Sequence, residues 1–116
     1  MSNWDEIKKE VESNGNVLTV SMITLREAAG KDKLGVNVVK EISKTLAGMG
    51  LGHVPQELPL SQSESVRLYK RGTSIGDLIE MVLFPSESND RMLKEQLDKE
   101  LVNYASIIEK IRELVS

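Results

Sequence analysis

A repeat of aliphatic residues constrains the fold of this chain more than any other feature. Its members recur at intervals of four, four, four and three residues: Leu34, Val38, Ile42, Leu46 and Met49. Because an α-helix has about 3.6 residues per turn, this spacing places all five on one side of a helix, which we expect over Gly35–Met49. The opposite side carries Asn37, Lys40, Glu41 and Lys44. Such a helix buries one face and presents amide and ammonium groups on the other.

A shorter helix is expected immediately before this one. Thr24 can cap its N-terminus, and Glu27 stands at the third position of a capping box, so Leu25–Ala29 should be helical. Gly30 then ends the helix, because glycine takes a left-handed backbone conformation without steric cost. With Lys31–Leu34 as the turn, the two helices have the order of a helix-turn-helix.

Short extended segments flank the two helices. Val17–Met22 is β-branched and too short for another helix, which favours a strand. Gly52–Gln56 and Ser65–Lys70 are two further strand candidates, and the polar segment Glu57–Glu64 between them should form a hairpin tip. A strand before a helix-turn-helix and a hairpin after it is the order of elements in a winged helix.

Further helices are expected at both ends of the chain. Trp4–Ser13 follows Asn3 as its cap, and Ile75–Phe84 follows Thr73 or Ser74. The last segment, Asn89–Ser116, has apolar residues at alternating spacings of four and three, which is typical of a coiled-coil seam. These residues are Leu97, Leu101, Tyr104, Ile108, Ile111 and Val115. The segment could fold back on the core, join a further domain or pair with a second copy, and we expect the homodimer. The predicted domains are therefore a winged helix-turn-helix (1–84) and a dimerisation or linker helix (85–116).

Composition excludes several classes of protein. With 116 residues, 40% of them hydrophobic and 28% charged, the chain should form one globular core. The absence of cysteine excludes disulfides, thiolate-bound zinc and a thiol nucleophile. Aromatic residues are only 3%, which disfavours binding of single strands by base stacking. No apolar run reaches the length of a membrane span and the N-terminal segment is too charged for a signal peptide, so we expect a cytoplasmic protein.

Positive charge is concentrated around the helix-turn-helix. The net charge is −3, yet residues 16–71 carry eight basic and five acidic side chains, a net +3. The candidate DNA-binding residues are Lys31, Lys33, Asn37, Lys40, Lys44, Arg67, Lys70 and Arg71. The basic side chains could contact phosphates, and Asn37 could pair with adenine. The competing interpretation is a solvated surface that keeps the protein soluble.

The usual parts of a catalytic or metal site are missing from the sequence. His53 is the sole histidine, so a metal would have only carboxylates as its other ligands, and we expect no metal or cofactor. Asp77 and Glu80 lie three residues apart without a histidine or a phosphate-binding loop, so we expect no enzyme. Tyr69 could contact a phosphate or sugar, but we expect its ring to pack on the sheet and its hydroxyl to remain in water.

The segment ITLREAAGKDKLGVNVVKEISKTLAGMGLGHVPQELP resembles the winged helix-turn-helix modules that are fused to other domains in bacterial regulatory and defence-related proteins. The matching positions are Thr24, Leu25, Arg26 and Glu27, then Lys31, Lys33 and Gly35, then Gly50, Leu51 and Pro55. Asp32, between two lysines, departs from the basic turn of that family. The resemblance covers about a third of the chain and implies a winged-helix fold with DNA contact, or a role as a protein adaptor.

The sequence therefore predicts a mainly α fold with a small β-wing, built as a winged helix-turn-helix plus a long C-terminal helix. Its predicted function is that of a non-enzymatic DNA-binding regulatory module whose recognition helix, residues 35–49, lies in the major groove of double-stranded DNA. A two-fold dimer would bind a palindromic site. The alternative is a protein–protein interaction or dimerisation adaptor of a larger bacterial effector, which the net acidity and the apolar stripe of the last helix favour.

Overall fold

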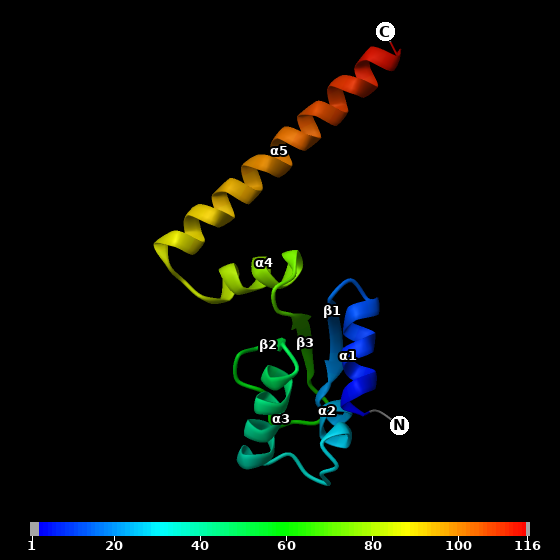
Figure 1. Cartoon of the computed structure of the whole chain (residues 1–116), viewed down its shortest axis with the longest axis vertical. Coiled ribbons are helices and arrows are strands. Elements are labelled where there is room, and N and C mark those ends of the chain that lie inside the picture. Colours follow the sequence, from blue (N-terminus) through cyan, green and yellow to red (C-terminus); the bar gives the residue numbers. More distant parts are fainter. Residues whose placement is uncertain (1–2, 116) are drawn as a thin grey trace. The chain divides into compact units, whose positions relative to one another are not determined.

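The computed structural model describes residues 3–115, apart from the side chains at positions 101, 102 and 115. The fold is mainly helical, with a small three-stranded antiparallel sheet and a long C-terminal helix (Figure 1). The elements in chain order are α1 (Trp4–Ser13), β1 (Val17–Ser21), α2 (Met22–Ala28), α3 (Val36–Gly48), β2 (Leu51–Val54), β3 (Ser65–Lys70), α4 (Ser74–Leu83) and α5 (Glu87–Val115). The chain divides into two compact units, Met1–Asp77 and Leu78–Ser116.

The sheet joins strands from both sides of the α2–α3 pair. Its order is β1-β3-β2, so the central strand β3 is the last of the three in the sequence. Leu68 of β3 lies opposite Leu18 of β1 and opposite His53 of β2, and both pairings are antiparallel. The strand that precedes the two helices therefore pairs with the hairpin that follows them.

The core is aliphatic and lies where α1, α2 and α3 pack against the sheet. Its fully buried residues are Ile7, Val11, Met22, Leu25, Ile42, Leu46, Leu51, Val66 and Leu68. Leu34, Val38 and Met49 are partly buried against this cluster, so the predicted apolar face of α3 is confirmed. Burial of this face holds the helix in a fixed orientation on the unit.

Several predicted boundaries are confirmed. The helix α1 has the predicted bounds, and the side chain of Asn3 caps it by accepting a hydrogen bond of 2.9 Å from the backbone N–H of Glu6. Gly30 has φ +68°, the left-handed conformation expected of the residue that ends the short helix. The helix α3 begins at Val36 and ends at Gly48, one residue inside the predicted range at each end.

The start of α2 corrects the prediction that Thr24 caps the helix. The helix begins at Met22 with Ser21 in the cap position, and the side chain of Ser21 makes no capping hydrogen bond. The amides of the first two helical residues donate instead to the carbonyls of Glu64 and Gln62, at 2.9 and 3.1 Å. A capping box is a local motif, whereas these acceptors lie about forty residues further along the chain, and the tertiary contact prevails.

The connection between β2 and β3, residues 55–64, folds back over the helices. Besides the two carbonyls at the start of α2, the side chain of Gln62 accepts a hydrogen bond from Arg26 Nη1 on that helix. Leu58 is partly buried against the core. The hairpin is present as predicted, but its tip lies against α2 and α3 because these polar and apolar contacts hold it there.

Side-chain caps precede the last two helices. Thr73 Oγ1 accepts a hydrogen bond of 3.2 Å from the N–H of Gly76 in α4, as one of the two predicted caps would. Ser86 Oγ accepts a hydrogen bond of 2.9 Å from the N–H of Asn89 in α5. The helix α5 has 29 residues and begins two residues before its predicted start. Of the helices within residues 3–115, none combines the length and the apolar character that crossing a membrane requires.

Candidate nucleic-acid interface

Three of the candidate side chains form one exposed stripe on α3. Asn37, Lys40 and Lys44 are three and four residues apart, which places them on the same side of the helix, and all three are exposed. The buried residues Ile42 and Leu46 anchor the opposite side of the helix. We call these three residues the α3 stripe; it presents one amide and two ammonium groups to the solvent in a fixed orientation.

The lysines of the turn before α3 are also exposed, and one of them is paired. Lys31 Nζ lies 3.6 Å from the carboxylate of Glu41, which belongs to α3. Both side chains are well exposed, so the pair contributes little to stability, but it offsets one positive charge. Lys33 is exposed beside Asp32. The turn therefore adds less positive charge next to the α3 stripe than a count of its lysines indicates.

The basic residues of the hairpin do not form one patch. Side chains of a strand alternate between its faces, so Arg67 and Lys70, three positions apart on β3, lie on opposite faces of the sheet. Arg67 is exposed, whereas the ammonium of Lys70 contacts the carboxylate of Glu12 on α1. Arg71 follows the strand, and its backbone N–H donates to the carbonyl of Gly50, which immediately precedes β2. One flat ligand surface could not contact Arg67 and Lys70 together.

Tyr69 is buried against the sheet. Its ring lies where a side chain on Gly52 of the neighbouring strand would be, and the residue is only 3% exposed. The predicted packing of the ring on the sheet is confirmed, but the predicted exposure of its hydroxyl to water is not, because the residue is almost fully buried. The residue offers too little surface to a phosphate or sugar, so the competing interpretation is disfavoured.

His53 connects α3 to the hairpin. Its Nε2 lies 2.8 Å from Ser43 Oγ on α3, and its Nδ1 lies 2.8 Å from the carbonyl oxygen of Pro55. In the neutral ring, Nδ1–H donates to the carbonyl and Nε2 accepts from the serine hydroxyl. Among the residues whose side chains are described, no group of three or more histidine, aspartate and glutamate residues could hold a metal ion. The two hydrogen bonds of its ring give His53 a structural role, because they join α3 to the residue that follows β2.

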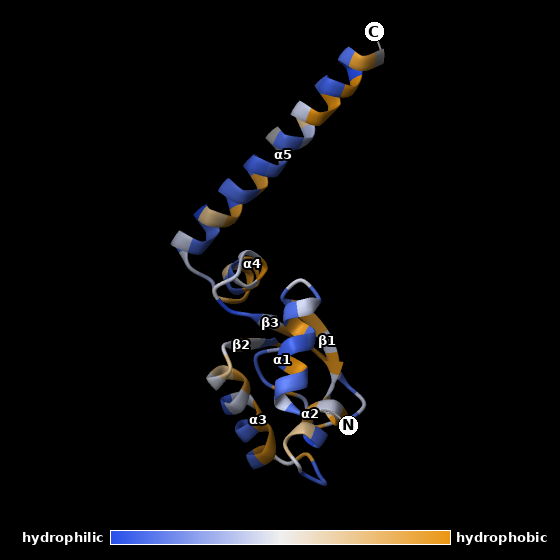
Figure 2. Cartoon of the chain, turned by 45° about the vertical axis from the view of Figure 1, so that its right-hand side comes forward, coloured by the Kyte–Doolittle hydropathy of each residue, from blue (hydrophilic) through white to orange (hydrophobic). Residues whose placement is uncertain are grey.

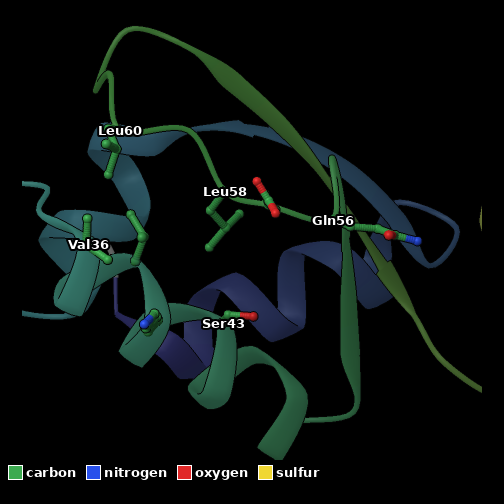
Figure 3. A pocket seen from close by; sticks show the side chains of 8 residues that line it. Val36, Ser43, Gln56, Leu58 and Leu60 are labelled. Atoms are coloured by element: carbon green, nitrogen blue, oxygen red, sulfur yellow. The ribbon is translucent and has the colours of Figure 1, made fainter.

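A groove of about 420 Å³ opens between α3 and the connection that folds back over it (Figure 3). Leu58 points into the groove towards α3. Of its apolar residues, Val36 and Leu60 are 57% and 55% exposed. The full lining is Val36, Val39, Lys40 and Ser43 from α3, with Gln56, Glu57, Leu58 and Leu60 from the connection. We call this feature the α3 groove, and Lys40 belongs both to it and to the α3 stripe.

The α3 groove was not predicted from the sequence, because residues 57–64 were interpreted only as the polar tip of a hairpin. A signal was present, since Leu58 and Leu60 are two large apolar residues in an otherwise polar segment. None of the protein-family models, curated proteins or solved structures compared with the chain matches it. A functional assignment therefore rests on the geometry of this chain.

The predicted dimerisation residues lie on α5. Leu97, Tyr104, Ile108 and Ile111 are each between 48% and 65% exposed. The side chains of Leu101 and Val115 lie outside the described residues. Figure 2 shows apolar segments recurring along α5 between hydrophilic ones. The helix thus carries a stripe of exposed apolar side chains.

Proposed function

We propose that this chain is a non-enzymatic, winged-helix DNA-binding regulatory module. The order α1-β1-α2-α3-β2-β3, with β1 beside β3, supports the winged-helix assignment, because it matches the element order that the sequence analysis expected of that fold. The observation that carries the DNA proposal is the exposed α3 stripe of Asn37, Lys40 and Lys44 on a helix whose other face is buried. In a helix-turn-helix, the second helix is the one that lies in the major groove.

The chemistry of the α3 stripe fits a duplex. An α-helix with its side chains is about 10–12 Å wide and the major groove of B-DNA is about 12 Å wide, so α3 can enter it. Asn37 lies in the first turn of α3, where recognition helices contact base edges, and its amide can pair with adenine. Lys40 and Lys44 would contact phosphates, with Lys33 and Arg67 as further exposed cations. In this proposal the protein is cytoplasmic and forms a homodimer through α5.

The test is duplex binding by electrophoretic mobility shift at about 50 and 200 mM salt. The double substitution Lys40→Glu/Lys44→Glu should abolish the shift, whereas the wild type should bind more weakly at the higher salt concentration. A matched control is Lys9→Glu/Lys99→Glu, which makes the same change in net charge at exposed positions on α1 and α5. The proposal fails if the α3 substitutions leave the low-salt affinity unchanged, or if the control lowers it as much.

A protein-interaction adaptor is the second candidate, and the α3 groove favours it. Exposed Val36 and Leu60 flank this groove beside the very helix that would read DNA, and Glu57 places a carboxylate there. An apolar groove suits a peptide or helix better than a phosphate backbone. If the wild type shows no duplex binding at low salt, the adaptor becomes the better proposal. The substitution Leu60→Glu should then weaken partner binding, while Lys44→Glu should not.

A further inference from the structure

The apolar face of α5 is broader than a simple two-position seam. In a repeat of seven, Leu97, Tyr104 and Ile111 form one column, and Leu101, Ile108 and Val115 form the other by their sequence positions. Ile107 and Leu114 form a third apolar column beside these two, and both are exposed. Because the C-terminal half of α5 has three apolar columns, its partner must cover a wider apolar surface than the two columns of a coiled-coil seam.

The most direct partner is a second copy of α5. Tertiary packing of an apolar face supplies most of the stability of a helix, so a partner that covers the large exposed apolar side chains of α5 would stabilise it. A second copy supplies an equally long helix with the same apolar columns.

We propose that two α5 helices pair antiparallel, with the two-fold axis of the pair passing near position 106. This register sets Tyr104 against Ile108 in the partner chain, and the reverse pair follows by symmetry. By sequence position, it also sets Leu101 against Ile111 and Leu97 against Val115. Each residue of the seam therefore meets a different apolar residue of the seam, and no polar residue enters these layers.

The charges that flank the seam favour this direction. In an antiparallel pair, the column beside one edge of the seam faces the same column of the other helix. Asp98 and Arg112 belong to one such column, and the register brings Asp98 of each chain to within about 3 Å, along the axis, of the level of Arg112 in the other, which allows two ion pairs. Within one helix these two residues are about 21 Å apart along the axis, so they cannot pair there. On the opposite flank, Ile107 lies next to its own copy, with an axial offset of about 3 Å.

A parallel pair would lose these contacts. Lys94 lies seven residues before Leu101 and thus at a seam position, so a parallel pair would set two copies of Lys94 against each other. It would also place Ile107 beside Arg112 and leave Asp98 without a basic residue opposite it. Like charges at the seam oppose association, and this cost is absent from the antiparallel register.

This inference rests on the homodimer within the proposed function and is independent of DNA binding. The first test measures distance. The chain has no cysteine, so a single introduced cysteine can carry a spin label without background labelling. A label on Arg91→Cys should lie about 45 Å from its copy along the axis of an antiparallel pair, since each label is fifteen residues from the two-fold axis. In a parallel pair the two labels would face each other with no axial offset.

The matched control is a label on Ser106→Cys, which should give a distance of about 20 Å in either direction because it has no axial offset. Pulsed electron paramagnetic resonance on both variants of the full chain measures these label-to-label distances. A long distance at position 91 with a short distance at 106 supports the proposal. Short distances at both positions, or no dipolar signal at 106, overturn it.

The second test reverses charges. The single substitutions Asp98→Arg and Arg112→Asp should each weaken dimerisation about tenfold in sedimentation equilibrium, because each turns two attractions into two repulsions. The double substitution Asp98→Arg/Arg112→Asp should restore the wild-type dissociation constant to within about threefold. Absence of rescue overturns the register. Because these measurements contain no DNA, their failure is distinguishable from failure of duplex binding.

Discussion

The hydroxyl of Ser43 on α3 lies 2.8 Å from Nε2 of His53 on β2, and this hydrogen bond ties the proposed recognition helix to the hairpin. Removing either side chain should lower the free energy of unfolding by about 1 kcal/mol. Because the two groups contact each other, the effects of Ser43→Ala and His53→Ala should not add. Urea unfolding of the two single variants and the double variant measures this coupling. Additive effects would contradict the bond.

Leu46 anchors the buried face of α3 and is fully buried. The substitution Leu46→Ala should lower the free energy of unfolding by about 2–5 kcal/mol, since it removes apolar contacts and leaves a cavity. The control is Val36→Ala on the same helix, which removes a mostly exposed side chain and should change stability by less than about 0.5 kcal/mol. Thermal unfolding followed by circular dichroism compares the two. Equal losses would mean that α3 does not pack through Leu46.

Gly52 is required by the ring of Tyr69, because a Cβ at position 52 would overlap the end of that ring. The ring is buried, so moving it to make room for a Cβ disturbs its packing, and Gly52→Ala should destabilise the protein by about 1–3 kcal/mol. The matched control is Gly48→Ala, where a Cβ would have no neighbour within 4 Å and where alanine favours the helix. Denaturant midpoints should therefore fall for the first variant and hold or rise for the second.

The contact between Glu12 and Lys70 predicts a dependence of stability on pH. The hydrogen bond from Lys70 holds the pKa of Glu12 below its usual value of 4.5 in the folded protein. As pH falls, the Glu12 carboxyl is therefore protonated at a higher pH in the unfolded state than in the folded state. The stabilisation is complete above the pKa that Glu12 has in the unfolded state, and it disappears as pH falls through its pKa in the folded state. The substitution Glu12→Gln should lower stability slightly at pH 7 and have no effect at strongly acidic pH.

Unfolding curves of the wild type and Glu12→Gln between pH 7 and about pH 2 test this sign. The control is Glu10→Gln, which makes the same chemical change on the same helix. If the stability difference between wild type and Glu12→Gln grows as pH falls, the ion pair of Glu12 with Lys70 is not its cause. In a Lys70→Met background, Glu12→Gln should no longer change stability at pH 7. This result would assign the effect to the contact between Glu12 and Lys70.

Elements whose signals are local could be predicted from the sequence. The bounds of α1 follow from Asn3 and the apolar spacing after it, and those of β3 follow from the alternation of Val66 and Leu68 with Arg67 and Tyr69. The apolar face of α3 follows from the spacing of its aliphatic residues, and the burial of Ile42 and Leu46 confirms it. In each case the residues that decide the structure lie within a few positions of one another, so periodicity and capping rules are sufficient.

Contacts between distant segments could not be predicted in this way. The carbonyls of Gln62 and Glu64 replace the expected cap of Thr24, and no local pattern announces a partner forty residues away. The same fold-back creates the α3 groove and brings Leu58 onto the core. The ion pairs that engage Lys31 and Lys70 also depend on where other elements lie.

The sequence alone determined which faces of the helices are apolar, because side-chain chemistry and helical period suffice for that. Only the tertiary structure decided which of the basic residues share a surface. It paired Lys31 with Glu41 and Lys70 with Glu12, and it brought the connection between β2 and β3 beside the α3 stripe, where the α3 groove forms. The physical reason is that a surface is assembled from segments far apart in the chain, and their placement follows from the burial of the core rather than from the charges themselves.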